Sequence, residues 1–65
     1  MGYEDAYRRL RGYLYPRGMH YHRVVGHEEL GDSVLIQLRL LAERVVRTFR
    51  VHRDQRVEEL PVTWL

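Results

Sequence analysis

Residues 32–51 read DSVLIQLRLLAERVVRTFRV, and the conformation of this segment separates two possible architectures. On a helical wheel its apolar side chains fall in one arc and most of its polar side chains fall opposite. The apolar arc consists of Val34, Leu35, Leu38, Leu41, Ala42, Val45, Val46 and Phe49. Asp32 or Ser33 supplies an N-cap oxygen just before the first apolar residue, and Gly31 precedes it as a stop signal. The pattern therefore favours a long amphipathic helix.

The same segment also fits a pair of β-strands. Alternation would place four large apolar side chains on one face, namely Val34, Ile36, Leu38 and Leu40. The turn between the strands would then fall near residues 41–44. These four residues favour helix and include no Gly, Pro, Asn or Asp to supply turn geometry. We therefore expect the helix, and we keep as the alternative an N-terminal helix followed by an antiparallel β-meander.

The flanking segments predict a second helix, a short strand and a hairpin. Residues 4–15 place their apolar and tyrosine side chains on one helical face, and Pro16 ends that helix. Residues 19–25 predict a short strand. Residues 48–52 and 57–65 predict a hairpin with Asp54 in its turn. The expected fold is a single α+β domain, residues 1–65, with an N-terminal helix, a short strand, a long central amphipathic helix and a C-terminal β-hairpin.

This order of elements resembles that of winged-helix DNA-binding domains. In that family the long helix enters the major groove and the hairpin wing contacts the DNA backbone. The resemblance covers most of the chain in element order and includes no diagnostic motif. The chain departs from the family's pattern at residues 28–30, which are too few for the full helix expected before the recognition helix. What the resemblance implies is DNA binding by the central helix.

Length and composition limit how this domain can be stabilised and where it acts. A chain of 65 residues has a small core, and the absence of cysteine excludes disulfides and thiolate zinc sites. A partner subunit is the remaining common supplement, so we expect a homodimer. No apolar run approaches the roughly 20 residues of a membrane span, and the N-terminus has no signal-peptide core. We expect a cytoplasmic protein without a membrane partner.

All eleven basic side chains are arginines, and they are unevenly distributed. Residues 1–27 carry five Arg against two acidic residues, whereas residues 28–65 carry six Arg against seven. A basic segment indicates an acidic partner, either nucleic acid or an acidic protein. We expect a small nucleic-acid-binding protein such as a DNA-binding regulator, with DNA favoured over RNA. The residues expected to contact nucleic acid are Arg8, Arg9, Arg11, Arg17, Arg23, Arg44 and Arg47.

A second hypothesis is a protein-interaction module or a small inhibitor. On the expected central helix, Ile36 and Leu40 lie among polar side chains and arginines. Exposed apolar residues fit a protein contact better than a surface that binds in a DNA groove. The expected partner interface is an apolar seam of Ile36 and Leu40 with an arginine rim.

The histidines give only weak signals for chemistry. The pattern His20-x-His22, followed by His27, could hold a metal, because alternate residues of a strand point the same way. We expect neither a metal nor another cofactor, and His20, His22 and His27 stay weak candidates. No cysteine nucleophile or glycine-rich phosphate loop is present. We therefore expect no catalytic residues, the alternative being a small ribonuclease that uses His20, His22 or His52.

Overall fold

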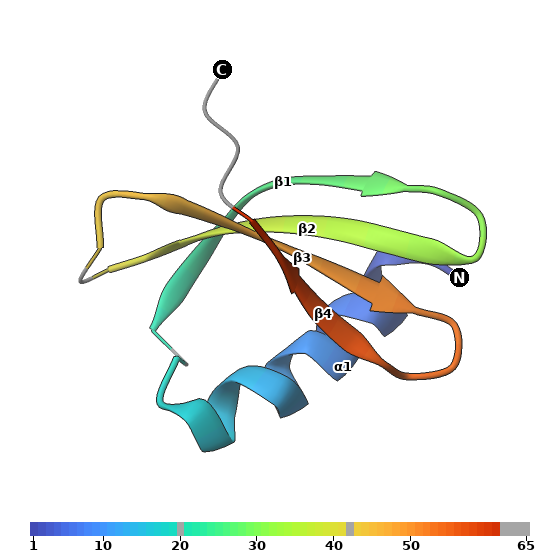
Figure 1. Ribbon diagram of the computed structural model, residues 1–65, viewed down its shortest axis with the longest axis horizontal. Helices are drawn as coiled ribbons and strands as arrows, with labels where there is room; N and C mark the ends of the chain where they lie inside the picture. The colour runs from blue at the N-terminus through green and yellow to red at the C-terminus, as the bar shows by residue number, and fades with distance from the viewer. Residues whose placement is uncertain (20, 42, 62–65) are drawn as a thin grey trace.

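The computed structural model, which describes residues 1–19, 21–41 and 43–61, contains one helix layer and one sheet (Figure 1). The elements in chain order are helix α1 (Tyr3–Leu14), the 3-10 turn η1 (Tyr15–Arg17), and strands β1 (His22–Glu29), β2 (Ser33–Leu40), β3 (Val46–His52) and β4 (Val57–Leu60). The strands pair antiparallel in the order β1-β2-β3-β4. Helix α1 crosses one face of this meander, and no described helix or strand covers the other face, called the open face below.

The prediction of a long central helix is wrong, because residues 33–40 and 46–52 are strands β2 and β3. The winged-helix order of elements is wrong for the same reason. The stated alternative, a helix followed by an antiparallel β-meander, is the observed fold. Buried and exposed side chains alternate along β2, as expected of a strand with one buried face. Ile36 and Leu38 are buried toward α1, whereas Gln37 and Arg39 are exposed on the open face.

The connection between β2 and β3 forms without the usual turn residues. The Glu43 backbone N–H donates to the Leu40 carbonyl at 3.0 Å, which reverses the chain immediately after β2. Leu41 and Arg44 in this connection are exposed. Helix propensity at these positions is worth only a few tenths of a kcal/mol per residue. Strand pairing on both edges of β2 outweighs it.

The predicted N-terminal helix is confirmed. Ala6, Leu10 and Leu14 form its buried face, at the helical spacing of four residues. Pro16 lies in η1, and Gly18 ends that turn at φ 74°, where its N–H donates to the Tyr15 carbonyl at 3.1 Å. A residue without a Cβ adopts this left-handed conformation at little cost.

The core lies between α1 and the inner strands β2 and β3. Phe49 is its largest fully buried side chain. The other members of this cluster are Ala6, Leu10, Leu14, Val34, Ile36, Leu38 and Val51. All the β2 and β3 members sit at alternate positions of their strands, so a single face of the sheet supplies the core.

The predicted C-terminal hairpin is present as β3 and β4, with register Arg50↔Glu58 and Val51↔Val57. The carboxylate of Asp54 accepts a hydrogen bond from the Arg56 N–H at 3.1 Å, as expected of an aspartate that starts a turn. Gln55 has φ 75°, a left-handed conformation that is uncommon for a residue with a Cβ.

We expect Gln55→Gly to stabilise the protein by about 0.5–1 kcal/mol, because glycine removes the steric cost of the left-handed conformation. Urea unfolding followed by circular dichroism measures the change. Arg53→Gly is the matched control, because it adds a glycine to the same turn at a position without positive φ and should be destabilising. A lower midpoint for Gln55→Gly would contradict the account.

Candidate nucleic-acid interface

The structure divides the seven arginines expected to bind nucleic acid among four regions. Four belong to the helix layer, at the exposed side and C-terminal end of α1 and in η1, namely Arg8, Arg9, Arg11 and Arg17. Arg23 lies on β1, on the face of the sheet away from α1, and Arg44 lies in the connection between β2 and β3. Arg47 lies on β3, on the face toward α1. The seven therefore do not form one surface.

Arg11 lies between two tyrosines at the C-terminal end of α1. Its guanidinium carbon is 5.4 Å from the centre of the Tyr15 ring and 6.0 Å from that of Tyr7. Its Nη2 donates to the Tyr15 hydroxyl at 2.9 Å. This hydrogen bond raises the pKa of Arg11 above its ordinary value. Cation–π contacts of this kind hold an exposed guanidinium in place.

Arg17 is held in a similar way in η1, directly after the helix. Its guanidinium carbon lies 3.7 Å from the centre of the Tyr13 ring, and its Nη1 donates to the Tyr13 carbonyl at 2.8 Å. The Tyr13 ring packs edge-on against Phe49, with ring centres 6.0 Å apart. Arg17 is thus an exposed cation resting on a ring that the core fixes.

Arg8 and Arg9 differ in what they contact. Arg8 is 80% exposed, and its only ion pair among the described residues is a long one, 3.8 Å from Nη1 to Asp5 Oδ1. Arg9 donates from Nη1 to the carbonyls of His52 and Arg53, at 3.4 and 3.1 Å. Arg9 therefore ties α1 to the end of β3, whereas Arg8 is open to a ligand.

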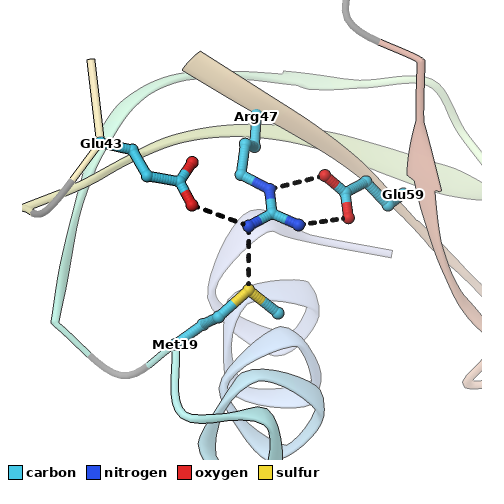
Figure 2. Close-up of polar contacts among 4 residues, drawn as sticks. All are labelled: Met19, Glu43, Arg47 and Glu59. Atoms are coloured by element: carbon cyan, nitrogen blue, oxygen red, sulfur yellow. Dashed lines mark hydrogen bonds and ion pairs between the residues drawn. The ribbon is translucent and has the colours of Figure 1, made fainter. Parts of the chain in front are cut away.

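Arg47 is committed to other side chains of the protein (Figure 2). Its Nε and Nη2 donate to the two carboxylate oxygens of Glu59, at 2.6 and 2.7 Å, in a bidentate pair. Its Nη1 lies 3.3 Å from Glu43 Oε1 and 3.3 Å from Met19 Sδ. The hydrogen bonds to Glu59 raise the pKa of Arg47 above its ordinary value. Four of the five N–H donors of this guanidinium are thus engaged by other side chains of the protein.

The open face of the sheet carries a basic pair that the sequence did not single out. Arg23 on β1 lies directly across from Arg39 on β2. Like charges at opposed positions destabilise a strand pair, and neither arginine has an ion-pair partner within residues 1–19, 21–41 and 43–61. If the segment had been taken as a strand, its alternation would have predicted that Arg39 is exposed on this face.

The apolar seam expected at Ile36 and Leu40 is not on the surface. Both side chains point toward α1, and their exposed fractions are 0% and 8%. The wheel that placed them among polar residues assumed a helix. Strand alternation places them in the core, so Ile36 offers no surface to a partner and Leu40 very little.

The histidines do not gather into a site in the described part of the chain. His22 Nε2 lies 2.8 Å from the Tyr7 hydroxyl, and His27 stacks on Tyr3 with ring centres 4.1 Å apart. His20 lies outside the described residues. His52 contacts Glu58 at 3.0 Å, and this hydrogen bond lowers the pKa of the glutamate. No group of three or more potential ligands could hold a metal among the residues that the structure describes.

No helix in the described ranges is both long and apolar enough to span a membrane. Comparisons with family models, curated proteins and solved structures find no match to this chain. Its function is therefore inferred from the arrangement of its own side chains, among which the exposed arginines Arg11 and Arg17 are held over tyrosine rings.

Proposed function

We propose that this protein binds nucleic acid through the basic helix end, a surface formed by Arg8, Arg11, Tyr13, Tyr15 and Arg17. Residues 8–18 contain four arginines and no acidic residue. The observation that carries the proposal is that Arg11 and Arg17 each lie over a tyrosine ring. Neither has a carboxylate partner among the described residues.

The chemistry of these side chains suits an anionic polymer. Guanidinium groups pair with phosphate oxygens through two parallel hydrogen bonds. A guanidinium already resting on a ring loses less side-chain entropy on binding than a free one. Its exposed plane can also stack on an unpaired base. The basic helix end therefore offers phosphate contacts together with stacking that tolerates any base sequence.

A purely structural role for the same arginines makes a different prediction. Positive side chains at a helix C-terminus complement the helix dipole and contribute about 0.3–1 kcal/mol each without any ligand. Only a binding measurement separates the two roles. DNA is the expected form of the ligand.

We expect the double variant Arg11→Gln/Arg17→Gln to weaken DNA binding and to flatten its salt dependence. Each lost phosphate contact should reduce the slope of log K against log salt concentration by about 0.7–0.9. Fluorescence anisotropy with labelled single-stranded DNA, duplex DNA and RNA, between about 50 and about 200 mM salt, measures the slope. Circular dichroism confirms that the variant is folded.

The matched control is Arg53→Gln/Arg56→Gln, which removes the same charge from the turn between β3 and β4. Figure 1 shows this turn and the C-terminal end of α1 at opposite ends of the molecule. The control should keep the slope of the unmodified protein. Equal losses in both double variants would mean that net charge alone drives binding, and an absence of binding at the lowest salt would remove the proposal.

A further inference from the structure

Strand β1 is a long, open edge of the sheet. Only β2 pairs with it among the described residues. It has eight residues, most of them exposed, whereas the opposite edge strand β4 has four. The outer side of an edge strand presents unpaired N–H and C=O groups, to which another strand can bind. β1 is therefore the edge at which a second chain can extend the sheet.

The charges along β1 are ordered by sign. Arg23 is near its start, and Glu28 and Glu29 are at its end. Two copies of β1 laid antiparallel bring the positive start of each against the negative end of the other. Opposite charges at facing positions favour strand pairing, and like charges oppose it. The same operation on β4 would set Glu58 or Glu59 against the same residue of the second copy, so charge favours β1 as the self-pairing edge.

A β-bulge in the middle of β1 puts the matching charges on one face. In a regular strand, residues five positions apart lie on opposite faces. The extra residue of the bulge reverses this relation. Arg23 faces Arg39 and Glu28 faces Leu35, and both partners are at odd positions of β2 that turn away from α1. When two antiparallel β1 strands pair side by side along their full length, Arg23 of each copy thus lies across from Glu28 of the other on the same face.

We propose that this protein forms a dimer by antiparallel pairing of two β1 strands. The register sets Arg23 against Glu28, His22 against Glu29 and Val24 against His27 of the second copy. The two-fold axis is perpendicular to the sheet, because paired strands keep their faces. The four-stranded sheet becomes eight-stranded, with both α1 helices on the same side.

This dimer does not depend on nucleic-acid binding, since neither Arg23 nor Glu28 belongs to the basic helix end. It would, however, present two basic helix ends on one side of a continuous sheet. Charges and bulges on an edge strand hinder unselective pairing. In the proposed dimer the same features select a single partner and a single register.

Light scattering and sedimentation equilibrium of the full chain test the proposal. We expect the mass to approach twice 7.9 kDa as the concentration rises. Arg23→Glu and Glu28→Arg should each weaken the dimer about tenfold, because two facing pairs become repulsive. The double variant Arg23→Glu/Glu28→Arg should restore dimerisation, because the two charges exchange places. Thermal unfolding of each variant shows that it is folded.

Cysteine cross-linking tests the register separately, because the chain has no cysteine of its own. A mixture of Arg23→Cys and Glu28→Cys chains should form disulfide-linked heterodimers readily, since facing residues of paired strands are within disulfide range. Each variant alone should cross-link much less. Gln37→Cys is the control, because both edges of β2 are already paired.

Three results would overturn the proposal. A mass of 7.9 kDa at the highest concentration would exclude a dimer. A dimer insensitive to both charge reversals, with no preference for the mixed cross-link, would use another surface. A mass that grows beyond two copies would indicate head-to-tail pairing of β1 with β4, which does not close.

Discussion

Ile36→Asp is expected to leave the chain unfolded at 25 °C. Ile36 is fully buried between β2 and α1. Its replacement removes about 2–3 kcal/mol of apolar burial and places a carboxylate in the core without a partner, which costs several kcal/mol more. A domain of this size rarely has more than about 3–5 kcal/mol of stability. Circular dichroism and a proton–nitrogen correlation spectrum would show the loss of structure.

Gln37→Asp is the matched control, one residue further along the same strand. Gln37 is exposed on the open face, and a surface substitution of this kind should change stability by no more than about 0.5 kcal/mol. On a central helix, both positions would lie on the polar side and both variants would fold. A folded Ile36→Asp protein would therefore count against the sheet. Leu40→Asp should unfold the chain as well, because Leu40 is buried on the same face of β2.

The elements that could be predicted from the sequence are those whose signals are local. Helix α1 has a 3.6-residue apolar repeat that ends at Pro16, and all its buried residues lie on the expected face. The hairpin of β3 and β4 has polar turn residues around Asp54 between two extended segments. In both cases the residues that define the element also lie within it, so a single chain segment contains the information.

The central segment could not be assigned because its decisive interactions are non-local. Residues 33–40 fit both periods, and residues 41–44 favour helix when taken alone. β2 becomes a strand because β1 and β3 pair with both its edges. Those partners lie on either side of it in the chain, and β1 itself was predicted too short. A sequence window that contains β2 alone carries no information about pairing on its two edges.

The same limit applies to the candidate site. The basic stretch from Arg8 to Arg17 was visible as a run of arginines without acids, and most of it is exposed at one end of α1. In the sequence, Arg47 could not be distinguished from the arginines of that stretch. Its ion pair with Glu59 exists only because the register of β3 against β4 brings together residues twelve positions apart. The register of the strands decides which arginines are free for a ligand. Composition contains no information about register.

We expect Arg47→Met to lower the free energy of unfolding by about 2–3 kcal/mol. Methionine keeps most of the packing of the arginine stem and removes only the charge and its donors. The variant leaves the carboxylates of Glu43 and Glu59 without their shared cation. Fully buried pairs lose about 3–5 kcal/mol when one partner is removed. With 23% and 30% of the two side chains exposed, solvent reduces this loss. Urea unfolding measures it.

A double-mutant cycle separates the ion pair from the packing around it. In Arg47→Met/Glu59→Met no charge of the bidentate pair is left unpaired, so the double variant should be more stable than the sum of the single losses predicts, by about 1 kcal/mol or more. Arg44→Met is the control, because Arg44 is exposed in the preceding connection and should change stability by less than about 0.5 kcal/mol. An Arg47→Met protein as stable as the unmodified chain would place the pair among surface salt bridges of negligible worth. Arg47 would then again be a candidate for phosphate contact, because replacing the contacts in Figure 2 by a phosphate would cost little free energy.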